Sequence, residues 1–69
     1  MAIKGGRIDE HNLFYDDDGK HWHLTTDAVG SSGFHDMDLS EYEGKKVQVF
    51  YVSEVGDWLA GVEDIMVSD

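Results

Sequence analysis

The sequence predicts one mainly β domain over residues 1–69, and three observations lead to this prediction. Apolar and polar residues alternate with a period of two over much of the chain, which is typical of half-buried strands. Glycines and turn-forming dipeptides separate the alternating segments, as they do in small sheet proteins. The chain has no cysteine and 41% apolar residues, so a single thin core without disulfides is expected.

The opening segment, residues 2–9, is expected to form the first strand, with Ile3 and Ile8 pointing inward. Gly5 and Gly6 interrupt its alternation. Paired glycines inside a strand are typical of a bulge or a sharp bend. A small barrel needs such a bend, so this feature favours a curved sheet.

Residues 12–25 are expected to form a β-hairpin with a two-residue turn at Asp18-Gly19, because this dipeptide favours a type I′ turn. The register that follows places four apolar residues on one face: Leu13, Tyr15, Trp22 and Leu24. A shift of one residue would mix the two faces, since Phe14 would then pair with Trp22.

Residues 46–67 predict a second hairpin, because its first half is rich in β-branched and aromatic residues. The turn is expected at Val55-Gly56. In that register Phe50 covers Gly61, a glycine inside a strand whose backbone needs a neighbour to shield it. The two predicted registers place both tryptophans in the core: Trp22 and Trp58.

The middle segment, residues 27–44, breaks the strand pattern. A flexible loop is expected at the glycine- and serine-rich residues 30–33. One short helical turn is expected over Leu39–Glu43, with Asp38 as its N-cap and Gly44 as its C-cap. This turn lies between the third and fourth predicted strands.

The predicted order of elements is three strands, a short helical turn and two strands. Within the segment Leu39–Val49, the pattern "leucine, x, x, tyrosine, x, glycine, lysine, x, valine" is similar to the entry into the fourth strand of many small OB-fold domains. The resemblance implies a five-stranded OB-like barrel. OB domains bind single-stranded nucleic acid or oligosaccharide through strands two and three and the adjoining loops. It therefore implies a ligand face at Phe14, His21, Trp22 and His23.

The charge of the chain opposes direct binding of nucleic acid. The sequence has 15 Asp+Glu against 5 Lys+Arg, for a net charge of −10. OB faces that bind nucleic acid are lined with Lys and Arg, and a negative protein repels both nucleic acid and anionic lipid. Neither direct nucleic-acid binding nor a membrane partner is expected.

The location expected from the sequence is cytoplasmic. The N-terminal residues lack the apolar segment of a signal peptide. The longest apolar run, Val49–Val52, is far too short to span a membrane.

Metal and catalytic sites are weakly indicated. His21 and His23 leave the same face of a strand, and Asp16 would be a third metal ligand across the hairpin. A solvent-facing pair of histidines with cross-strand contacts is preferred, so no metal or other cofactor is expected. The chain contains neither a nucleophile elbow nor a phosphate-binding glycine loop, so the protein is not expected to be an enzyme.

The excess of carboxylates favours a basic partner. A net charge of −10 exceeds the magnitude of about 2–8 that keeps a small domain soluble, and the excess costs stability through self-repulsion. Acidic residues two apart in extended backbone are about 6.5 Å apart, comparable to the phosphates of a nucleic-acid strand. Small, acidic, cysteine-free chains resemble phage-encoded inhibitors of host nucleases and defence complexes. The resemblance implies a nucleic-acid mimic that docks on a basic protein, such as one that binds nucleic acid.

The expected contact surface joins apolar anchors to a rim of carboxylates, as protein interfaces do. The expected residues are Phe34, Asp36, Met37, Asp38, Glu41 and Glu43, with Asp16, Asp17 and Asp18 of the hairpin turn. Phe34 and Met37 either plug one end of the barrel or contact the partner. Two alternatives stay open: an OB-like domain that binds nucleic acid or another ligand directly, and a small metal- or sugar-binding module that uses the His21 and His23 face.

Overall fold

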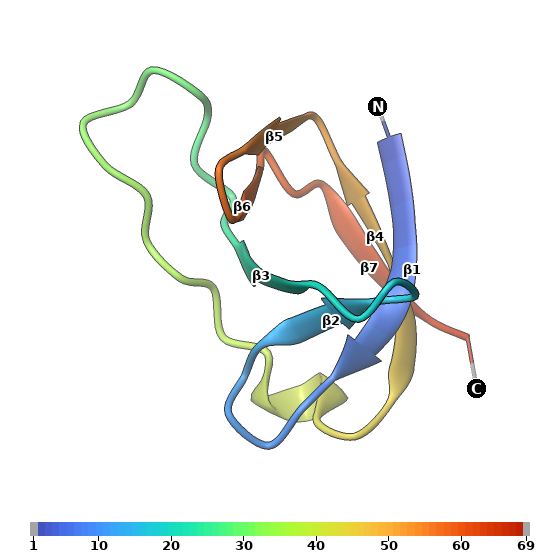
Figure 1. Ribbon diagram of the computed structural model, residues 1–69. Helices are drawn as coiled ribbons and strands as arrows, with labels where there is room; N and C mark the ends of the chain where they lie inside the picture. The colour runs from blue at the N-terminus through green and yellow to red at the C-terminus, as the bar shows by residue number, and fades with distance from the viewer. Residues whose placement is uncertain (1, 69) are drawn as a thin grey trace.

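The computed structural model describes residues 2–68, which form seven strands and one short 3-10 helix (Figure 1). In chain order the elements are β1 (Ala2–Ile8), β2 (Phe14–Asp16), β3 (His21–Leu24), η1 (Ser40–Tyr42), β4 (Lys46–Tyr51), β5 (Ser53–Val55), β6 (Trp58–Ala60) and β7 (Asp64–Val67). The mainly β prediction is confirmed. Within the described residues, no helix is long and apolar enough to cross a membrane.

The strands form one open sheet in the order β5-β6-β3-β2-β1-β4-β7, so the predicted closed barrel of five strands is not what the structure shows. β1 pairs antiparallel with both β2 and β4, and β3 pairs parallel with β6. The number of strands is larger because two predicted strands are each divided. A bend at Val52 separates β4 from β5, and residues 61–63 separate β6 from β7.

The first hairpin forms, but its predicted register is wrong by one residue. Phe14 pairs with Trp22, and the loop has three residues, 17–19. Gly19 takes a positive φ of 84°, whereas Asp18 does not take a positive φ, so the type I′ turn is ruled out. The Asp16 carboxylate favours the longer loop, because it accepts hydrogen bonds from the backbone N–H of Asp18 and Lys20, both at 2.9 Å.

This register decides which side chains of the hairpin are buried. Phe14, Trp22 and Leu24 lie in the core, whereas Leu13 and Tyr15 are only half-buried. The predicted apolar face is therefore wrong for the two residues on the first strand.

The second hairpin is also displaced from its predicted register. Its turn is Gly56-Asp57, since Val55 pairs with Trp58 and Gly56 takes a positive φ of 58°. Val52, rather than Phe50, covers Gly61. A Cβ added at Gly61 would lie 3.0 Å from the Cβ of Val52.

The core lies on the inner face of the curved sheet. It contains Ile8, Phe14, Trp22, Leu24, Leu39, Val47, Val49, Tyr51, Leu59, Val62 and Ile65, with Met37 and Tyr42 packed against it. The inward prediction is confirmed for Ile8 and Trp22. It is wrong for Ile3, which is 59% exposed beside Phe50 on the outer face, and for Trp58, which is only half-buried.

The two glycines of β1 mark a close approach to β2. A Cβ at Gly6 would lie only 1.8 Å from the carbonyl oxygen of Tyr15, so no larger residue fits there without separating the strands. A Cβ at Gly5 would meet only the Asp17 carboxylate, at 3.2 Å. Of the two glycines, only Gly6 is therefore strictly required by the close approach of β1 and β2.

The predicted helical turn is present as η1, with its caps shifted by one residue. Leu39 is the N-cap and Glu43 the C-cap. The Asp38 carboxylate accepts a hydrogen bond from the backbone N–H of Ser40 at 2.9 Å, which lowers the pKa of Asp38. Gly44 follows with a φ of 75°, and its N–H donates to Ile8.

Candidate functional site: a histidine and aspartate face

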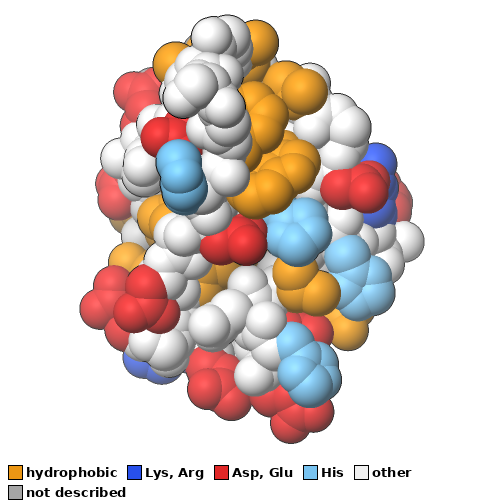
Figure 2. Space-filling model, turned by 90° about the vertical axis from the view of Figure 1, so that its left-hand side faces the viewer, with side chains coloured by type: hydrophobic (Ala, Val, Ile, Leu, Met, Phe, Trp, Pro, Cys, Tyr) orange, Lys and Arg blue, Asp and Glu red, His pale blue; other side chains and the backbone are white. Residues whose placement is uncertain are grey.

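One face of the molecule gathers histidine, carboxylate and hydrophobic side chains (Figure 2). A hollow of about 330 Å³ lies on it, between the β1–β2 loop, β3 and the long connection that leads to η1. The residues that line the hollow are His11, Asn12, Leu13, His23, Asp36 and Met37. None of the six is Lys or Arg, so the charged group at this hollow is a carboxylate.

The β1–β2 loop is held by the carboxylate of Asp9. Its Oδ1 accepts hydrogen bonds from the backbone N–H of His11 at 2.8 Å and of Leu13 at 2.9 Å. Burial would raise the pKa of Asp9, but these hydrogen bonds outweigh that effect and lower it. Asn12 takes a left-handed φ of 62°, which asparagine tolerates better than most residues, so the loop has a defined shape.

Three rings lie in contact beside the hollow and are here called the aromatic ledge: His23, Phe34 and Trp58. The His23 and Trp58 rings are stacked with their centroids 4.8 Å apart, and Phe34 lies 5.4 Å from Trp58. The parallel pairing of β3 with β6 brings His23 opposite Trp58. Leu59, the next residue, is fully buried in the core, so the alternation of the strand turns Trp58 toward this surface.

Imidazole–carboxylate contacts tether the long connection to the sheet. Asp36 Oδ1 lies 3.1 Å from His23 Nδ1, and the backbone N–H of Met37 donates to Leu24. Asp27 Oδ2 accepts from the backbone N–H of His35 at 2.8 Å and lies 3.1 Å from its ring Nδ1. These contacts with His35 lower the pKa of Asp27, so Asp27 stays ionised and keeps its contact with the loop.

The structure brings together three of the predicted contact residues: Phe34 on the ledge, and Asp36 and Met37 in the hollow. Phe34 is half-buried and contacts Trp58 rather than the core, whereas Met37 packs against the core. Asp38 binds the backbone at η1, and two exposed carboxylates lie on or next to η1: Glu41 and Glu43.

The acidic hairpin turn is not part of this hollow. Asp16 is committed to local hydrogen bonds, including one from Trp22 Nε1 at 2.8 Å. Asp17 lines a separate hollow beside Arg7. Asp18 is exposed at the tip of the turn.

The three candidate metal ligands are not brought together. His21 packs on the ring of Tyr15 at 4.1 Å, His23 packs on Trp58, and the Asp16 carboxylate faces Trp22. Within residues 2–68, no three His, Cys, Asp or Glu side chains form a group that could hold a metal ion.

The ligand face implied by the OB resemblance is only partly on the surface. Phe14 and Trp22 are core residues, and only the two histidines of β3 point outward.

Sequence reasoning missed four residues of this face: His11, Asn12, Trp58 and Leu13, the last of which was expected in the core. Asp9 followed by a polar tripeptide is a turn signal that could have located the loop. No local pattern signals the outward position of Trp58, because that position depends on pairing between distant segments. No family model, curated protein or solved structure matches the chain, so its function is inferred from the geometry of this face.

Proposed function

We propose that this protein is a non-enzymatic binding protein that docks on a basic protein surface through its histidine and aspartate face. The observation that supports this proposal most directly is the hollow itself, because it places the Asp36 carboxylate beside the aromatic ledge. Interfaces combine a desolvated aromatic anchor with charged groups at the rim. Both parts are present within this one face.

Docking begins with long-range attraction. A net charge of −10 raises the rate at which a basic surface is encountered, and salt screens this effect. In the complex, Phe34 and Trp58 provide apolar contact area. Asp36 accepts hydrogen bonds from a Lys or Arg of the partner, while His23 holds the carboxylate in place.

The partner that fits this description best is a protein with a groove for nucleic acid. Such grooves are rich in Lys and Arg, which Asp36 and the exposed carboxylates on or next to η1 would contact. The chain is small, acidic and free of cysteine, as are phage-encoded inhibitors of nucleases and defence complexes. We assign it the same kind of role, that of a nucleic-acid mimic.

A second candidate function follows from the position of the hollow. An OB-like topology is supported by the antiparallel pairing of β1 with β4 and the parallel pairing of β3 with β6. It is also supported by the short break between β4 and β5, which consists of Val52 alone. OB domains bind ligands beside the loop between strands one and two, and the hollow adjoins that loop. Fluorescence anisotropy with labelled single-stranded DNA and RNA tests this candidate, and micromolar binding at physiological salt would favour it.

The proposal is tested with an arginine-rich peptide as the probe, immobilised for surface plasmon resonance at two salt concentrations. One variant removes three exposed charges of the long connection and η1: Asp36→Asn, Glu41→Gln and Glu43→Gln. Its control removes three exposed charges that lie outside this hollow and away from the ledge rings: Asp17→Asn, Asp18→Asn and Glu54→Gln. The first should slow association and flatten its salt dependence more than the control does, because local charge governs encounter.

The aromatic ledge is tested with the same probe. Trp58→Ala should speed dissociation with little change in the rate of association, because apolar contacts form after encounter. Equal effects of the two charge variants, together with an unchanged dissociation rate for Trp58→Ala, would contradict docking through this face.

A further inference from the structure

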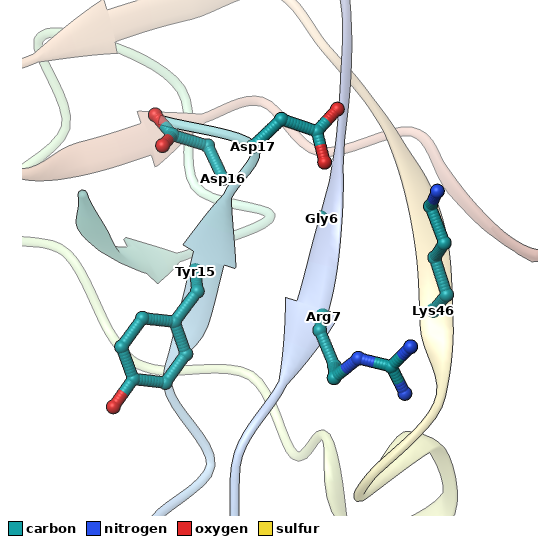
Figure 3. A pocket seen from close by; sticks show the side chains of 6 residues that line it. All are labelled: Gly6, Arg7, Tyr15, Asp16, Asp17 and Lys46. Atoms are coloured by element: carbon teal, nitrogen blue, oxygen red, sulfur yellow. The ribbon is translucent and has the colours of Figure 1, made fainter. Parts of the chain in front are cut away.

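A second hollow lies apart from the histidine and aspartate face, and we propose that it binds a small zwitterion with one carboxylate and one ammonium group. The hollow has a volume of about 270 Å³ and is formed by β1, β2, β4 and the β2–β3 turn. Its lining residues are Gly6, Arg7, Tyr15, Asp16, Asp17 and Lys46 (Figure 3). The two hollows share no lining residue.

The first argument is the state of Arg7. Its Nη1 donates a hydrogen bond to the carbonyl oxygen of Gly44 at 2.7 Å, which orients the guanidinium group. No carboxylate of residues 2–68 forms an ion pair with it, although the chain has 15 acidic residues. A guanidinium has five N–H donors, so most remain directed at solvent or a ligand.

The neighbouring strand adds a second cation. Arg7 stands directly opposite Lys46 in the β1–β4 ladder. Lys46 lines the hollow as well, so the side of the site next to Arg7 is cationic. A carboxylate also matches the planar donor pattern of a guanidinium.

The second argument is the state of Asp17. Within the described residues, no hydrogen bond or ion pair engages its carboxylate, whereas the carboxylate of Asp16 accepts from three donors. Asp17 lies over the bare backbone of β1, because a Cβ at Gly5 would come within 3.2 Å of its Oδ2. Figure 3 shows the side chains of Asp17, Arg7 and Lys46 arranged around Gly6.

The combination of charges selects the class of ligand. A simple anion would meet the carboxylates that line the hollow, and a simple cation would meet its two basic groups. A zwitterion places its carboxylate on Arg7 and its ammonium group on Asp17, so that each charged end of the ligand meets an opposite charge. The volume lies just below the range of about 300–1,000 Å³ for drug-sized ligands, so the ligand is a small amino acid.

The test is an NMR titration of the whole chain with three probes of increasing length: glycine, γ-aminobutyrate and ε-aminocaproate. Acetate and methylammonium serve as probes with a single charge. At least one zwitterion should shift the amide signals of Gly6, Arg7 and Asp17 with a Kd on the order of 1 mM. Acetate and methylammonium should bind at least about tenfold more weakly, which corresponds to the loss of one charged contact.

Two pairs of variants assign the contacts. Arg7→Gln and Asp17→Asn should each weaken binding of the zwitterion about tenfold or more. Lys45→Gln and Glu63→Gln remove exposed charges outside the hollow and should leave binding unchanged.

Asp17→Asn keeps the proposal testable if Arg7→Gln fails to fold, since no described contact depends on that carboxylate. The proposal is overturned if no zwitterion shifts these signals, if acetate binds as tightly as the zwitterions, or if Asp17→Asn binds like the parent. None of these results bears on docking through the other face.

Discussion

Replacing Gly6 by alanine should disrupt the fold, although it adds only one methyl group. The added Cβ would lie 1.8 Å from the carbonyl oxygen, 2.8 Å from the carbonyl carbon of Tyr15 and 2.9 Å from the Cα of Asp16. All three contacts are with the backbone of the paired strand, and Gly6 stands opposite Asp16 in the ladder. No change of rotamer can relieve them, so β1 and β2 would have to separate.

The size of the effect follows from these contacts. Overpacking a well-packed site costs about 1–3 kcal/mol even when side chains can adjust. Here they cannot, so the free energy of unfolding should fall by at least about 3 kcal/mol. A chain of this length has a total stability of roughly 3–10 kcal/mol, so at the lower end of this range about half of the population would be unfolded.

The adjacent glycine provides a matched control. A Cβ at Gly5 would meet only the end of the Asp17 side chain, which can move aside. Gly5→Ala should therefore change the free energy of unfolding by no more than about 0.5 kcal/mol. Urea unfolding followed by tryptophan fluorescence measures both variants. A Gly6→Ala variant as stable as Gly5→Ala would refute the close approach of β1 to β2.

Two further predictions concern the first hairpin. Phe14→Ala should lower the free energy of unfolding by about 3–5 kcal/mol, because Phe14 is fully buried. Leu13→Ala should cost clearly less in the same urea assay, and the reverse order would support the register with Leu13 inside. The hydrogen bond from the Trp22 indole lowers the pKa of Asp16, so the folded state binds fewer protons than the unfolded state near that pKa. This stabilisation is present above the pKa of Asp16 in the unfolded state, and it is lost as the pH falls through the pKa of Asp16 in the folded state. Asp16→Asn should therefore flatten the acid side of the curve of urea midpoint against pH.

The positions of the hairpins could be predicted from the sequence, but their registers could not. Asp18-Gly19 marks a turn in either loop length. The choice between two and three loop residues depends on the Asp16 carboxylate, which binds two backbone N–H groups and the indole of Trp22. Such contacts lie outside the alternation of apolar and polar residues, so the alternation alone favoured the wrong face.

The division of the last strands has a similar cause. The alternation that begins at Lys46 gives way to the apolar run Val49–Val52, and nothing in this run signals the bend. The structure bends there, where the N–H of Val52 donates to the carbonyl of Ala60 and that of Glu63 donates to Phe50. Gly61 takes a positive φ of 66° between these bonds. The sequence predicts that a neighbour covers the backbone of Gly61, but it does not show that this neighbour is Val52.

The candidate site was predictable where it depends on local composition and unpredictable where it depends on topology. Phe34 and Met37 stand out as apolar residues beside the Asp36 carboxylate within one loop. Trp58 belongs to the same surface only because β6 pairs in parallel with β3. Parallel pairing joins segments far apart in the chain, and no short pattern in either segment reports it.

The few basic side chains are distributed unevenly over the surface of the molecule. Lys4 and Lys20 lie over the ring of Trp22, at 5.0 and 4.1 Å from its centroid, and Arg7 and Lys46 line the zwitterion hollow. The hollow beside the aromatic ledge has no basic lining residue, and Figure 2 shows Lys and Arg only at the margins of that face. In the proposed docking, no Lys or Arg lining the hollow repels the approaching basic surface. Under this proposal, electrostatic attraction orients the partner before the aromatic residues make contact, because charge complementarity favours one docking orientation over others.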